Sequence, residues 1–199
     1  MGLSSWRSHH GSALTLPLLR CAACALISLL WLPALLAQAP TEKNAPPEAR
    51  PADVASIEAI IKAAFEVMSG PAGKERDWKR FRSLFKPSAQ FIIAPRRPDG
   101  SVNFTVRTID EYIANSWAWL EKNAVYEVEV HRITEQFGHL AHAFSTYESR
   151  EKPDTAQPSS RGVSSFQLVH DGQRWWIVNW FWLGERPDNP IPEKYLPRR

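Results

Sequence analysis

Hydrophobic residues recur along this chain with two different spacings, and the helical spacing predominates before residue 120. There most of them return every three or four residues, which is typical of helices that bury one face. The pattern predicts a helix over 53–68 with Asp53 as its N-cap, and a shorter helix over about 75–85. A third helix is expected to begin at Thr108, because Glu111 follows at the spacing of a capping box.

After residue 120 apolar and polar residues alternate, as they do in strands. Two short strands, 89–94 and 102–106, are expected before the third helix. Two long strands, 124–137 and 140–150, are expected to turn near Gly138, and a final hairpin covers 162–183. Helices followed by an antiparallel meander predict an α+β domain with helices on one face of a curved sheet.

The hairpin over 162–183 is the strongest local signal, because Asp171-Gly172 suits the positive φ angles of a tight turn. Its second strand is apolar on both faces, so we expect it to be central in the sheet. Strict alternation puts Phe166, Trp175 and Asn179 on one face and Trp180 and Trp182 on the other.

The same rule divides the strands 124–137 and 140–150. Tyr126, Arg132 and Tyr147 are expected on the face that helices cover. Glu127 and Glu129, with the neighbouring histidines, are expected on the opposite face, as a solvated or dimer-facing surface. The histidines meet only diagonally, so no metal site is predicted.

The N-terminal 39 residues have the pattern of a secretory signal peptide. Arg7 and Arg20 precede or flank an apolar run over 21–36, no acidic residue occurs, and Ala37 and Ala39 form a small-x-small cleavage site. We expect a signal peptide over 1–39, a flexible linker over 40–52, the folded domain over 53–184 and a proline-rich tail over 185–199. The protein would then be periplasmic or secreted; an uncleaved membrane anchor is the alternative.

Composition narrows the chemistry. Both cysteines, Cys21 and Cys24, lie in the signal segment, so a cleaved protein has no disulfide or thiolate site. Removing Arg7 and Arg20 from the 24 basic residues leaves 22 basic against 21 acidic residues. Such a balance does not indicate a nucleic-acid-binding surface. No phosphate loop or cofactor motif occurs, and no cofactor is expected.

The chain resembles the nuclear-transport-factor-2-like (NTF2-like) superfamily, and within it exported bacterial proteins called SnoaL-like. The resemblance covers about 53–183 and rests on the element order and on DWKRFRSLF (77–85), FGHLAHAFSTYE (137–148) and DGQRWWIV (171–178), with ERPDNPIP (185–192) typical of exported members of unassigned function. It implies a cone of curved, mostly antiparallel sheet closed by three helices, a pocket inside the cone, and a homodimer formed through the outer sheet face.

Enzymes of this superfamily carry an aspartate, or an aspartate and a histidine, inside the cone. The first strand here, SAQFIIA (88–94), has no carboxylate, so no catalytic residue is assigned. The candidate ligand-binding residues are polar or aromatic side chains expected on inward faces: Tyr126, Arg132, Tyr147, Phe166, Trp175 and Asn179. Each could instead be a satisfied core residue.

The leading hypothesis is therefore an exported domain that binds a small, partly apolar ligand in the cone. One alternative is an isomerase or dehydratase that acts on a small cyclic or carbonyl compound through Tyr147, Arg132 or a histidine. The other is a protein-interaction module that uses the outer face with Trp176, Trp180 and Trp182.

Overall fold

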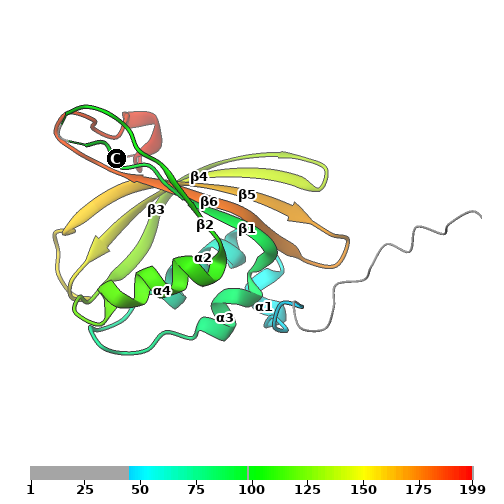
Figure 1. Cartoon of the computed structure of the whole chain (residues 1–199). Helices are drawn as coiled ribbons and strands as arrows, with labels where there is room; N and C mark the ends of the chain where they lie inside the picture. The colour runs from blue at the N-terminus through cyan, green and yellow to red at the C-terminus, as the bar shows by residue number, and fades with distance from the viewer. Residues whose placement is uncertain (1–44, 98, 199) are drawn as a thin grey trace, which may run out of the picture. The chain divides into compact units, whose positions relative to one another are not determined.

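Helices cover one face of a six-stranded sheet in the computed structural model, which describes residues 45–97 and 99–198 (Figure 1). The expected signal peptide and the first part of the expected linker lie outside the described residues. Within those ranges the helices are α1 (Pro51–Val54), α2 (Ile57–Met68), α3 (Trp78–Ser83) and α4 (Ile109–Leu120), with a short 3-10 helix, η2 (Glu193–Tyr195), in the tail.

The expected first helix is two helices. Ser56 has an extended backbone (φ −146°) and its side chain accepts the N–H of Ala59 at 3.1 Å, so Ser56 caps α2. The expectation that Asp53 is the cap of a continuous helix was wrong. Asp53 lies within α1 and is buried, and its carboxylate forms an ion pair of 2.7 Å with the Arg80 guanidinium.

The other helix ends follow local chemistry. Asp77 accepts the N–H of Arg80 and starts α3 three residues later than expected, and Phe85 already belongs to the next strand. The capping box of α4 is confirmed, because Thr108 and Glu111 satisfy each other's backbone N–H groups.

The sheet has the strand order β2-β1-β6-β5-β4-β3. Its strands are β1 (Phe85–Ile93), β2 (Thr105–Arg107), β3 (Tyr126–Phe137), β4 (Leu140–Arg150), β5 (Ser160–His170) and β6 (Trp175–Gly184). All pairs are antiparallel except β1 with β6. The two-sided apolar strand β6 lies between β1 and β5, as expected, and Gly138 and Gly172 take positive φ angles of 58° and 95° in the predicted turns.

Two β-bulges change which side chains face the helices. Val130 is an extra residue on β3, because Glu129 pairs with Tyr147 while His131 pairs with Thr146. Val178 is an extra residue on β6. A one-residue insertion moves every side chain beyond it to the other face.

The face assignments made from strict alternation are therefore corrected at both bulges. Glu127 and Glu129 pair with Ser149 and Tyr147 on the helix-covered inner face, which puts Tyr126 on the outer face. On β6, Trp180 and Trp182 pair with inward-facing residues of β5, and Asn179 lies on the outer face opposite Gln167.

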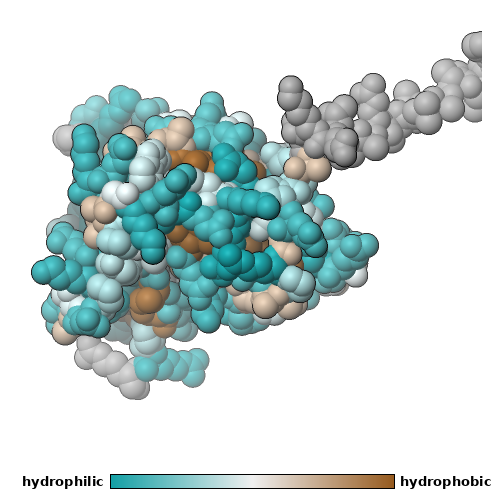
Figure 2. All heavy atoms as spheres, turned by 90° about the horizontal axis from the view of Figure 1, so that it is seen from below, coloured by the Kyte–Doolittle hydropathy of each residue, from teal (hydrophilic) through white to brown (hydrophobic). Residues whose placement is uncertain are grey.

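The core fills the space between the inner face and the helices. Phe65 of α2, Phe81 of α3 and Phe91 of β1 are almost fully buried and surround Trp180 at ring distances of about 6 Å. Seen from the helical side, the surface is mostly hydrophilic and hydrophobic atoms show only in small recesses (Figure 2). The helices have thus buried their apolar stripes against the sheet.

The C-terminal tail lies on the other side of the sheet from the helices (Figure 1). Glu185 pairs with Arg161 at 2.7 Å, the Tyr195 ring packs 4.8 Å from that of Phe144, and the Thr146 hydroxyl donates to the Tyr195 carbonyl at 2.5 Å. The tail therefore covers part of the outer face, where a homodimer interface was expected; the homodimer stays a prediction.

Candidate functional site

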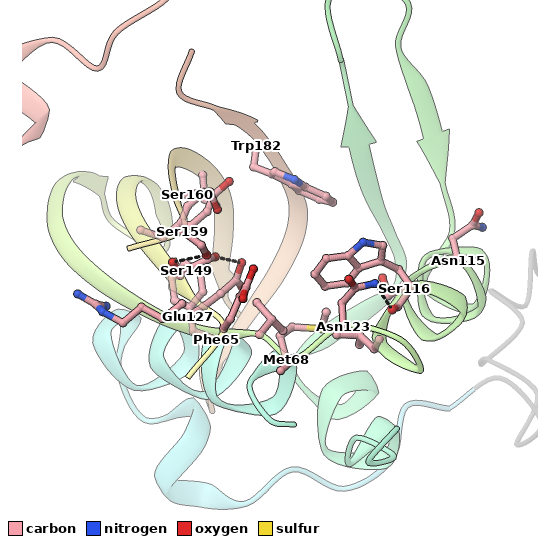
Figure 3. Close-up of a pocket in the computed structure, with 18 of the residues that line it drawn as sticks. Phe65, Met68, Asn115, Ser116, Asn123, Glu127, Ser149, Ser159, Ser160 and Trp182 are labelled. Carbon is pink, nitrogen blue, oxygen red and sulfur yellow. Dashed lines mark hydrogen bonds between the residues drawn. The ribbon is translucent and has the colours of Figure 1, made fainter. Parts of the chain in front are cut away.

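A pocket of about 820 Å³ lies between the inner face of the sheet and α4. Its volume is within the usual range of small-molecule sites. Its apolar wall comes from α2, α4 and β6, and includes Phe65, Met68, Tyr112, Leu120, Trp180 and Trp182. Polar side chains line it from two sides: Glu127, Ser149, Ser159 and Ser160 on the sheet side, and Asn115, Ser116 and Asn123 near α4 (Figure 3).

Glu127 is the acidic group inside this pocket. Its carboxylate accepts a hydrogen bond of 3.0 Å from the Ser149 hydroxyl (Figure 3), and the ion pairs of the described residues include none with Glu127. Burial raises the pKa of Glu127 above its ordinary value, and the Ser149 hydrogen bond offsets this only in part. The carboxyl group can therefore hold a proton at a higher pH than an exposed glutamate.

Tyr147 lies beside this carboxyl group. Burial, and then the charge of Glu127, raise the pKa of the Tyr147 phenol, so the hydroxyl stays protonated and can donate a hydrogen bond. Its oxygen packs against Gly162, where an added Cβ would also lie only 2.6 Å from the Tyr147 Cζ atom. No hydrogen bond joins this hydroxyl to another described residue, and Tyr147 lines the pocket.

The loop after α2 fixes the start of β3 and hence Glu127. The Ser69 hydroxyl oxygen accepts the N–H of Glu127 at 2.9 Å, and Gly70 and Val125 exchange backbone hydrogen bonds of 2.6 and 3.0 Å. Arg76, which is 6% exposed, holds this loop closed.

The Arg76 guanidinium donates to four backbone carbonyls of this loop. The acceptors lie at 2.6–3.1 Å and belong to Met68, Gly70, Pro71 and Lys74. One side chain therefore holds the loop closed. Because the loop binds the Glu127 backbone, the same side chain also fixes the position of Glu127.

Four basic residues are among those that line the pocket, and they come from three connections of the fold. Arg107 ends β2, Lys122 follows α4, and Arg150 and Lys152 stand at the end of β4. Arg150 is paired with Glu148 at 2.6 Å. Within the described ranges, no carboxylate pairs with the other three cations.

Of the six candidate residues from the sequence, Tyr147 lines the pocket. Phe166 is fully buried behind it, stacked 4.9 Å from Trp180, and Trp175 packs 5.2 Å from His170 near the hairpin turn. Neither lines the pocket.

The other three candidates also lie away from the pocket. Arg132 is on the inner face but pairs with Glu58 at 3.2 Å and Glu129 at 3.6 Å. Tyr126 and Asn179 are on the outer face because of the two bulges. Whether any of them binds a ligand stays a prediction.

Alternation missed Glu127, Trp180 and Trp182, which the bulges turn inward. The first strand has no carboxylate, as the sequence indicates. The carboxyl group of the pocket comes instead from Glu127 of β3, which strict alternation placed on the opposite face.

Residues 45–97 and 99–198 contain no group of three or more His, Cys, Asp or Glu side chains arranged to hold a metal ion. In the same part of the chain, no helix has both the length and the apolar character needed to cross a membrane.

Comparison with known proteins finds similarity in structure only. No protein-family model matches the chain, and no curated protein matches it. A protein of unknown function with a cystatin-like fold from Nostoc punctiforme is 10% identical with a TM-score of 0.49, over 69% of this chain and 98% of the other.

Two further solved structures are similar at the same level. An uncharacterised protein with a cystatin-like fold from Caulobacter vibrioides is 18% identical (TM-score 0.48, 67% of this chain and 90% of the other). An NTF-2 like protein of unknown function from Silicibacter pomeroyi is 16% identical (TM-score 0.43, 66% and 94%). The α+β fold expected from the sequence is confirmed by the helices and the mostly antiparallel six-stranded sheet of the structure itself. Membership of the NTF2-like superfamily stays a prediction.

Proposed function

We propose that this domain binds a small, partly apolar organic molecule in the pocket between α4 and the sheet. The proposal rests on one observation: an aromatic wall and an inward-facing carboxyl group, Glu127, share a single pocket of about 820 Å³. Trp180, Trp182 and Phe65 offer apolar surface, and Glu127 and Tyr147 offer polar contacts that would orient one end of the ligand.

The test is binding of phenylnaphthylamine, a neutral aromatic probe that fluoresces when it leaves water. Ser116→Phe fills the pocket from α4, and Ala118→Phe adds the same side chain to the same helix at an exposed position outside the pocket. Probe binding that Ser116→Phe abolishes and Ala118→Phe leaves unchanged supports the proposal. Equal binding by both variants and the wild type would place the probe elsewhere and contradict it.

A second candidate function is proton transfer on a carbonyl compound, as in an isomerase or dehydratase. The raised pKa of Glu127 favours it, because a general acid or base works best with a pKa near the working pH. Tyr147 would donate a hydrogen bond to the substrate oxygen while Glu127 exchanges a proton at the neighbouring carbon.

This candidate can be tested without knowing the substrate, by following the loss of α-deuterium from a deuterated cyclic ketone by NMR. Exchange that Glu127→Gln abolishes, while phenylnaphthylamine still binds, would establish the enzyme. Exchange that is equal in the wild type and in Glu127→Gln would exclude Glu127 as the base.

Export is the remaining part of the proposal and rests on the signal-peptide pattern of residues 1–39. N-terminal sequencing of the protein recovered outside the cytoplasm should begin at residue 40. Recovery with residues 1–39 still attached would favour the membrane-anchor alternative.

A further inference from the structure

Oxygen-bearing side chains gather where the pocket meets β3, β4 and β5. Glu127 pairs with Ser149 across β3 and β4, and Ser149 pairs with Ser160 across β4 and β5. The three residues therefore form one row across the sheet, at the strand spacing of about 4.8 Å. All three line the pocket, and they lie together at one side of it (Figure 3).

Tyr147 adds a fourth oxygen in the next row of the same face. It lies two residues before Ser149 on β4, and its partner on β5 is Gly162, which leaves room for the tyrosine ring. Tyr147 is 8% exposed and lines the pocket, and no hydrogen bond joins its hydroxyl to another residue of 45–97 or 99–198. A buried hydroxyl without a protein partner can bind a ligand.

The Glu127 carboxyl group lacks a positive partner. The ion pairs of the described residues include none with Glu127, and Ser149 donates the side-chain hydrogen bond that Glu127 receives. Burial therefore raises the pKa of Glu127, because nothing fully compensates its charged form. A cationic group on a ligand would supply that compensation.

The basic residues that line the pocket form no ion pair with Glu127. Arg150 already pairs with Glu148 at 2.6 Å. Arg107 belongs to β2, the opposite edge of the sheet from β3. Lys122 and Lys152 are exposed, so water and salt screen their charges. The partner that Glu127 lacks in the protein can therefore come from a ligand.

The chemistry of this row favours an ammonium group. A carboxylate accepts hydrogen bonds only, and the hydroxyl oxygens of serine and tyrosine accept as well as donate. An ammonium group carries three donors and no acceptor, so it needs such oxygens around it. The rings of Phe65 and Tyr147, whose centroids lie 6.1 Å apart, would add cation–π attraction beside Glu127.

From this geometry we propose that the ligand is an amphiphilic amine, whose ammonium group is held by Glu127, Ser160 and Tyr147. Its apolar body lies against Trp180 and Trp182, which also line the pocket. This inference rests on the proposed function, and it adds the chemical class of the ligand and its orientation in the pocket.

The experiment compares two ligands with the same aromatic body. Naphthylmethylamine carries an ammonium group at neutral pH, as lysine does, and naphthylmethanol carries a neutral hydroxyl in its place. Each is used to displace phenylnaphthylamine from the protein. The wild type should bind the amine about tenfold more tightly than the alcohol, because hydrogen bonds to charged groups are stronger than neutral ones.

Two variants test whether Glu127 is the source of this preference. Glu127→Gln keeps the size of the side chain and removes its charge, so the preference for the amine should disappear while phenylnaphthylamine still binds. The matched control Glu151→Gln removes the same charge from an exposed residue that also lines the pocket, and it should keep the preference. In the wild type, acid should abolish the preference as well, because Glu127 becomes protonated while the amine keeps its charge.

The outcomes separate this inference from the proposed function. If Ser116→Phe leaves phenylnaphthylamine binding unchanged, the pocket is not the binding site and the proposed function itself fails. If the probe binds in the pocket but the wild type binds amine and alcohol equally, the ammonium site is wrong while the pocket stands. A preference that persists in Glu127→Gln or in acid would overturn the inference in the same way.

Discussion

Arg76 allows the sharpest test of how the pocket is held in place. We expect Arg76→Met to destabilise the domain by about 2 kcal/mol, because the buried carbonyl of Met68 would lose its donor, whereas the Gly70 carbonyl keeps the N–H of Val125. An unsatisfied buried carbonyl costs about 1–3 kcal/mol, and the two at Pro71 and Lys74 can reach water instead. Relief of the buried charge offsets part of the loss.

Urea unfolding followed by tryptophan fluorescence measures this change in the free energy of unfolding. In a thermal scan the midpoint should fall by roughly 4–8 °C, at about 2–4 °C per kcal/mol for a domain of this size. Arg76→Lys keeps the charge without the planar fork and should fall between the wild type and Arg76→Met. Lys79→Met, at an exposed position on α3, is the control and should change stability by less than about 0.5 kcal/mol.

A loss below about 1 kcal/mol for Arg76→Met would refute the reasoning, because the loop carbonyls would then be satisfied by water. Phenylnaphthylamine binding by the folded variant gives a second measurement. The loop holds Val125 and the Glu127 backbone, so a loosened loop should weaken probe binding as well.

Three further predictions test other parts of the structure. Burial raises the pKa of Glu127, so the stability it contributes is full below its ordinary pKa of 4.5 and is lost as the pH rises through its folded pKa. Glu127→Gln should therefore flatten the fall in stability above pH 4.5. Parallel slopes in pH-dependent urea unfolding would show that Glu127 is not buried as described. Gly162→Ala should lower the free energy of unfolding by about 1–3 kcal/mol and weaken phenylnaphthylamine binding, because the added Cβ would displace Tyr147, which lines the pocket. Unchanged stability and binding would contradict that packing. Removing residues 186–199 should lower the unfolding midpoint and increase self-association in light scattering, because apolar residues of the outer face lose their cover. Removing 197–199 should do neither. A stable, monomeric product of the longer deletion would show that the tail does not cover that face.

The sequence predicts those parts of the fold whose conformation depends on interactions among a few neighbouring residues. The capping box at Thr108 and Glu111 and the turns at Gly138 and Gly172 depend on local backbone chemistry, and all three are confirmed. The break between α1 and α2 is also local, but two capping residues compete there. Ser56 starts α2, because Asp53 is taken by a long-range ion pair with Arg80.

The pocket depends on the two bulges, and strict alternation cannot predict them. A signal was present in the sequence of β3: apolar residues fall on even positions at Val128 and Val130 and on odd positions at Ile133 and Phe137. Such a change of phase is what a one-residue insertion produces. In β6 no such signal exists, because Trp175 and Ile177 before the bulge and Trp180 and Trp182 after it are all apolar, so either phase is possible.

The bulge at Val130 also explains why Glu127 is the residue from which function should be pursued. Without it, Glu127 and Glu129 would point outward and be solvated; with it, both enter the inner face. Glu129 is compensated there by Ser145 at 2.7 Å and Arg132 at 3.6 Å, whereas the hydrogen bond that Glu127 receives from a side chain is the one from Ser149. A half-buried carboxyl group without a paired cation costs stability that a glutamine would not, and groups with raised pKa values concentrate at functional sites. The inward turn of Glu127 is therefore not explained by what the fold requires, and it supports the proposal that the pocket binds a ligand.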